Sequence, residues 1–102
     1  MEPEITGWEV SLVPSVAEPG EKVSVKVRVY AGPGDTKIPC FARIYWIDGT
    51  RRRLDFYVYP ETGGSAVDYI YVPSDAKPGT YNVKVELYKY TTETQIVAGV
   101  VV

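Results

Sequence analysis

Strict alternation of apolar and polar residues over positions 22–30 limits the folds open to this chain more than any other feature. Valine occupies every second position from 23 to 29, and lysine, serine or arginine stands between the valines. A repeat of two residues places successive side chains on opposite faces of a β-strand. The segment therefore predicts a strand with one buried and one solvated face, as in antiparallel sheets.

Similar short runs recur along the chain, and Gly, Pro and Asp separate them. The sequence predicts strands at residues 5–13, 22–30, 40–47, 51–59, 66–72, 80–88 and 94–102. No segment shows a helical pattern. About seven antiparallel strands in 102 residues predict an all-β fold, an immunoglobulin-like β-sandwich of two sheets. That length suits a single domain over residues 1–102.

Asp48-Gly49 predicts a tight hairpin between the strands at 40–47 and 51–59. A two-residue loop would pair Ile47 with Thr50 and would mix arginines with apolar side chains on one face. A three-residue loop over 48–50 pairs Ile47 with Arg51 and separates the two kinds of side chain. We favour the three-residue loop, because a slip of one residue moves every side chain to the other face.

The favoured loop gives the hairpin one apolar face, which carries Ala42, Ile44, Trp46, Leu54, Phe56 and Val58. It also places Arg43 opposite Asp55, and Tyr45 opposite Arg53, pairs that stabilise a sheet modestly. The expected core of the sandwich comprises Val25, Val27, Ile44, Trp46, Phe56, Val83 and Val85.

Two segments resemble immunoglobulin-like surface modules of bacteria and archaea of the CARDB type. They are PSVAEPGEKVSVKVRVYAGPG at 14–34 and YVPSDAKPGTYNVKVELY at 71–88. Macroglobulin-like and fibronectin-type domains carry similar Pro-Gly-Thr-Tyr turns. After Leu87 the chain has YKYTTETQ where the CARDB type shows acidic residues and paired asparagines. The resemblance implies an accessory module of a cell-surface or secreted protein, and it makes Tyr81 the tyrosine of a tyrosine corner.

The residues needed for common catalytic sites are missing from the sequence. It contains no histidine, which removes Ser-His-Asp and Cys-His pairs and the usual zinc ligand sets. Its one cysteine, Cys40, lies beside Phe41 at the start of an apolar strand and is expected to be a buried, unreactive thiol. The carboxylates are scattered, and no loop holds three of them closely spaced. We therefore expect no catalytic residue, no metal and no cofactor.

Charge and hydropathy bear on the partners. The net charge of −2 predicts no nucleic-acid partner, and no apolar run is long enough to be inserted across a membrane. The densest charge run is the arginine triplet at 51–53, whose side chains must alternate between the two faces of a strand.

The outer face of the hairpin is the candidate binding surface. Tyrosine and arginine are the residues that dominate protein interfaces, so this face is expected to bind a protein partner or to self-associate. The alternative is a carbohydrate-binding module that uses exposed tyrosines and Trp8 as stacking platforms. The candidate partner-binding residues are Phe41, Arg43, Tyr45, Arg51, Arg53, Tyr57 and Tyr59.

Overall fold

The computed structural model describes residues 1–88 and 94–101, and it describes residue 88 and residues 94–101 by their backbone alone. Within these residues the chain is all-β. The strands are β1 (Ile5–Val13), β2 (Lys22–Ala31), β3 (Ile38–Tyr45), β4 (Arg51–Val58), β5 (Gly64–Tyr71), β6 (Thr80–Tyr88) and β7 (Thr94–Val101). The predicted boundaries differ from these by at most two residues, and residue 102 lies outside the described part.

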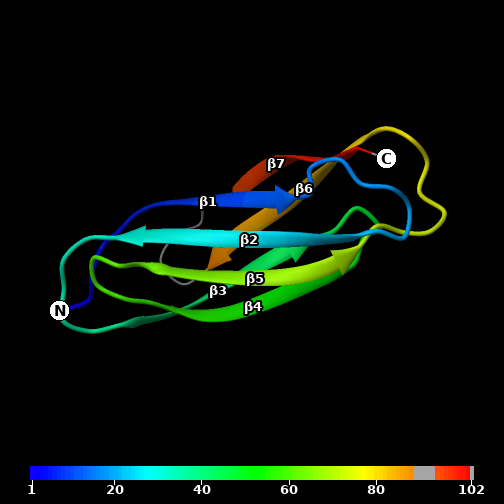
Figure 1. The fold of residues 1–102 in the computed structure, drawn as a ribbon. Helices are drawn as coiled ribbons and strands as arrows, with labels where there is room; N and C mark the ends of the chain where they lie inside the picture. The colour runs from blue at the N-terminus through cyan, green and yellow to red at the C-terminus, as the bar shows by residue number, and fades with distance from the viewer. Residues whose placement is uncertain (89–93, 102) are drawn as a thin grey trace.

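The strands form two antiparallel sheets. One has the order β1-β2-β5, and the other has the order β4-β3-β6-β7. Figure 1 shows β2 between β1 and β5, with β3 and β4 in the layer behind them. The molecule is elongated, with extents of 48 × 20 × 18 Å. The predicted all-β architecture of two antiparallel sheets is confirmed.

The core lies between the two sheets. The four valines of β2, at 23, 25, 27 and 29, are fully buried, as the alternation predicts. Across the sandwich they face Ile44 from β3 and Val83 and Val85 from β6, which belong to the same buried cluster. Of the predicted core residues, all are buried except Phe56, which is partly buried and packs against the cluster.

β3 begins at Ile38, two residues before the predicted start at residue 40, and it therefore includes Pro39. Pro39 pairs with Tyr57 of β4, but the pairing of β3 with β6 begins only at Phe41. Proline lacks a backbone N–H and is tolerated in a sheet where one side of the strand is unpaired. The strand can therefore include Pro39 even though β3 is central further along.

The hairpin between β3 and β4 has a loop of three residues, as predicted, but at 47–49 and not at 48–50. The Trp46 N–H donates to the Thr50 carbonyl at 2.9 Å, which closes the loop one residue earlier. Gly49 has φ of +89°. The third residue of such a loop has a left-handed backbone conformation, which glycine adopts without a steric penalty. A loop at 48–50 would have required the same conformation of Thr50.

The earlier loop shifts every pair of the hairpin by two residues. Arg43 lies opposite Arg53, not Asp55, and Tyr45 lies opposite Arg51. The predicted cross-strand pairs are therefore wrong. The predicted faces are right, because a shift of two residues leaves each side chain on its own side of the sheet.

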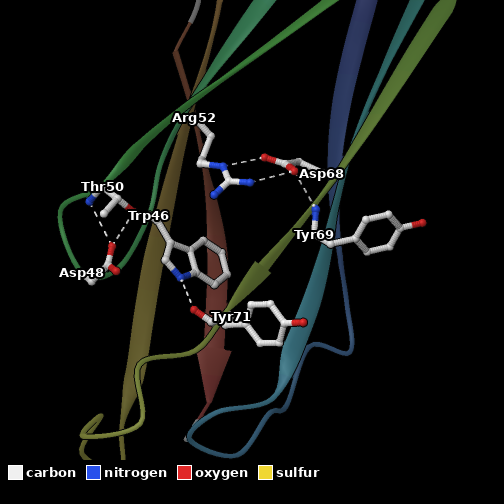
Figure 2. Close-up of polar contacts among 7 residues, drawn as sticks. All are labelled: Trp46, Asp48, Thr50, Arg52, Asp68, Tyr69 and Tyr71. Atoms are coloured by element: carbon white, nitrogen blue, oxygen red, sulfur yellow. Dashed lines mark hydrogen bonds and ion pairs between the residues drawn. The ribbon is translucent and has the colours of Figure 1, made fainter.

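Polar bonds join the two sheets where β4 and β5 run side by side (Figure 2). Arg52 of β4 donates from Nε to Asp68 Oδ2 at 2.9 Å and from Nη2 to Oδ1 at 3.2 Å. The indole N–H of Trp46 donates to the carbonyl of Tyr71 at 2.9 Å. Arg52 thus points toward the other sheet, away from the side of β4 that carries its neighbours, Arg51 and Arg53.

The turn between β4 and β5 brings backbones unusually close. A Cβ atom on Gly63, whose φ is +75°, would lie 2.1 Å from the carbonyl oxygen of Val29. The guanidinium of Arg28 holds the same corner, donating to the Gly64 carbonyl at 3.0 Å and to the Thr62 carbonyl at 2.6 Å. This corner fixes where β5 meets β2.

We predict that Gly63→Ala destabilises the domain much more than Gly49→Ala. Both glycines have positive φ, but nothing lies within 4 Å of a Cβ atom built on Gly49. Gly49→Ala should cost about 1–2 kcal/mol, the strain of the left-handed backbone alone. Gly63→Ala adds a backbone clash and should cost more than about 3 kcal/mol. Thermal unfolding measures the loss of stability in both variants. Equal losses would contradict the close approach of the Val29 carbonyl to Gly63.

A second prediction concerns the pKa of Asp48 in the hairpin loop. Its carboxylate accepts hydrogen bonds from the Thr50 hydroxyl at 2.6 Å and from the Thr50 N–H at 2.9 Å, and these bonds lower its pKa. Thr50→Val removes the hydroxyl, so the pKa of Asp48 should rise toward its ordinary value. Titration of the carboxyl carbon by NMR measures this, and an unchanged pKa would show that the hydroxyl bond is not formed.

The sign of the accompanying stability change follows from the lowered pKa. A carboxyl group whose pKa is lower in the folded state stabilises that state above its unfolded pKa of about 4. This stabilisation disappears as the pH falls through the folded pKa. The difference in unfolding free energy between the native protein and Thr50→Val should therefore shrink in acid.

Candidate functional site

All seven residues predicted to bind a partner lie along the outer side of the β3–β4 hairpin, away from the core. The structure adds two lysines to them, one from the segment before β3 and one from β6. We call this surface the basic–aromatic face. It comprises Lys37, Phe41, Arg43, Tyr45, Arg51, Arg53, Tyr57, Tyr59 and Lys84.

At one end of the face, Tyr45 lies between two cations. The sheet register places Arg51 of β4 and Lys84 of β6 on either side of it. The Arg51 guanidinium carbon is 5.4 Å from the centroid of the Tyr45 ring, and the Lys84 ammonium is 5.1 Å from it. Both distances are within the range of cation–π attraction. The half-buried tyrosine thus holds two long side chains in place.

The middle of the face repeats this arrangement with a carboxylate added. The Arg53 guanidinium carbon is 4.0 Å from the centroid of the Phe41 ring, and an Arg53 nitrogen is 3.0 Å from Asp55 Oδ1. Beside them Arg43 lies between Arg53 and Glu86 in the register. Ion pairs exposed in this way contribute little to stability.

The other end of the face carries its most exposed rings. Tyr57 and Tyr59 are 48% and 46% exposed, and their ring centroids are 6.5 Å apart at an angle of 56°. The Lys37 ammonium lies 4.2 Å from the centroid of Tyr57. A cation on a tyrosine ring therefore occurs at both ends of the face.

A shallow hollow of about 260 Å³ opens between the middle of the face and the Tyr57 end. Its lining residues are Pro39, Cys40, Asp55, Phe56 and Tyr57. The cysteine itself is buried, as predicted. The hollow is slightly smaller than sites that enclose drug-sized ligands, which begin at about 300 Å³. It has room for an apolar side chain.

The face is basic although the protein is acidic. Among the described residues it carries five cations, Lys37, Arg43, Arg51, Arg53 and Lys84, and its neighbours add two carboxylates, Asp55 and Glu86. The chain as a whole has a net charge of −2. Within the described residues this face thus carries more cations than carboxylates, although the whole chain is acidic.

Sequence reasoning missed the contributions of Lys37 and Lys84, because they come from outside the hairpin. It also missed a second exposed group on the outer side of the three-stranded sheet, where Tyr69 and Tyr71 are 56% and 62% exposed. Alternation within 66–72 was the available signal for these two tyrosines. In contrast, Trp8 is half-buried and packs against the core, so it is not the free stacking platform that the carbohydrate alternative required.

Two further features of the described residues bear on function. No group of three or more His, Cys, Asp or Glu side chains there is placed to hold a metal ion. In the same part of the chain there is no helix with the length and apolar character that crossing a bilayer requires.

Comparison with known proteins adds no family to this description. No model of a protein family matches the chain, and a search among curated proteins finds no significant match.

Proposed function

We propose that this chain is a non-catalytic interaction module that binds a protein partner, or a second copy of itself, through the basic–aromatic face. The observation that carries the proposal is the series of cations stacked on aromatic rings along a solvent-facing sheet surface. Tyrosine and arginine together supply apolar contact and hydrogen bonds, and both are enriched where proteins meet. The loops offer less to a partner, because many of their residues are Gly, Pro, Asp or Thr, which suit turns.

We propose further that the sandwich is of the immunoglobulin-like type. The hydroxyl of Tyr81 donates to the carbonyl of Lys77 at 2.5 Å, a bond to the upstream backbone typical of a tyrosine corner. The division of strands into β1-β2-β5 and β3-β6-β7 also fits that type, with β4 attached to β3. A location at the cell surface or outside the cell follows from the sequence resemblance alone.

A protein partner fits the face better than a carbohydrate does. Sugars stack on open ring faces, but Phe41, Tyr45 and Tyr57 each have a cation over the ring. The hydroxyls of Tyr45 and Tyr57 lie beside these charged groups. Such a surface suits a polypeptide that offers carboxylates and apolar side chains at once.

We predict that Tyr57→Ser combined with Tyr59→Ser weakens association and leaves the fold intact, because both side chains are about half exposed. Sedimentation velocity at rising concentration measures self-association, and co-purification of other proteins with the tagged chain measures binding to a partner. The matched control is Tyr69→Ser with Tyr71→Ser, which removes two somewhat more exposed tyrosines from the opposite sheet. If both pairs of substitutions weaken association equally, or if neither pair weakens it, the basic–aromatic face is not the binding surface.

A further inference from the structure

We propose that the basic–aromatic face binds an acidic segment of a partner protein in extended conformation. Every second side chain of this segment faces the sheet, with carboxylates on Arg51 and Arg53 and an apolar side chain in the hollow beside Tyr57. This inference rests on the proposed function and specifies the chemistry of the partner.

Charge complementarity is the first argument. The face and its neighbours carry five cations against two carboxylates, on a chain whose net charge is −2. A positive surface on an acidic molecule attracts a local run of acidic residues without attracting polyanions to the whole protein. Asp55 and Glu86 lie among the cations and would repel a continuous phosphate backbone. An acidic peptide with interspersed neutral residues avoids them.

Spacing is the second argument. Arg51 and Arg53 are two residues apart on β4, which puts them about 6.6 Å apart along the strand. An extended peptide has the same repeat, so carboxylates at positions i and i+2 can pair with both arginines. The next side chain of the repeat, at i+4, then reaches the level of Asp55 and Tyr57, where the hollow lies. A further carboxylate at i+6 reaches the level of Lys37, which is stacked on Tyr57.

The orientation of the guanidinium groups is the third argument. Arg53 lies over Phe41 and Arg51 over Tyr45, so the rings cover one side of each guanidinium group. The N–H donors of an arginine lie in the guanidinium plane, away from the ring that covers its side. Arg53 already donates from Nε to Asp55 Oδ1 at 3.1 Å, so a ligand carboxylate would bind the N–H groups at the outer end of its guanidinium. Carboxylates bind such a fork with two parallel hydrogen bonds. The aromatic rings thus orient the arginines for this ligand.

The test uses a blocked synthetic peptide, Glu-Ser-Glu-Ser-Leu-Ser-Glu, carrying a fluorescent label. Its affinity for the whole chain is measured by fluorescence anisotropy at low salt. Replacing Arg51 and Arg53 together by glutamine should weaken binding about tenfold, since each partly exposed ion pair is worth a few-fold in affinity. Higher salt should also weaken binding of the peptide to the native protein, because it screens exposed charges.

The matched control variant is Lys22→Gln with Lys26→Gln, which removes the same charge from the outer side of the three-stranded sheet. It should change the affinity less than twofold. A control peptide with the same residues but contiguous glutamates should bind the native protein more weakly. A thermal unfolding curve for each variant shows whether its fold is retained.

Several results would overturn the inference: no binding of the alternating peptide at millimolar concentration, an equal loss in both charge variants, or no preference for the alternating peptide. Tighter binding of a single-stranded oligonucleotide of equal charge would also overturn it and would identify a polyanion as the ligand. If the peptide fails while the Tyr57 and Tyr59 substitutions still abolish association, the face binds a protein of other chemistry. If both experiments fail, the proposed function falls as well.

Discussion

Contact between the inner faces of two sheets is the constraint from which the other features of this domain follow. Only side chains fill the space between the sheets, and the fully buried valines of β2 meet Ile44, Val83 and Val85 there. Because side chains alternate, burying one face of each strand sends the remaining residues to the solvent. The tyrosines of the hairpin are therefore on the outside as a direct result of the burial of their neighbours, and so are Arg43, Arg51 and Arg53.

Polar groups complete the sandwich at its edges, where apolar contact ends. Arg52 reaches across from β4 to Asp68 of β5, and the indole of Trp46 binds the backbone of the same strand at Tyr71 (Figure 2). The Arg28 guanidinium performs a similar role at the corner before β5. Trp46 can be buried because its one polar atom has a partner, as a buried indole N–H requires.

The sequence was sufficient to predict the strands, the buried face of each hairpin strand and the outward side of the candidate residues, because alternation determines all three. It was not sufficient for the register of β3 and β4. Asp48-Gly49 indicates a turn, but the position of the loop depends on which residue must be left-handed, and that residue is Gly49. Lys37 and Lys84 could not be assigned to the face, because only the pairing of β6 with β3 and the path of the chain before β3 place them there.

The cation–ring stacks have a consequence for conformational entropy. Arginine and lysine side chains on a protein surface ordinarily sample many rotamers, and a ligand that immobilises them loses that freedom at the moment of binding. Here the rings of Phe41, Tyr45 and Tyr57 already restrict Arg53, Arg51 and Lys37 in the free protein. Part of the loss of rotamer freedom has thus already occurred during folding, so a ligand of this surface has less side-chain motion to suppress.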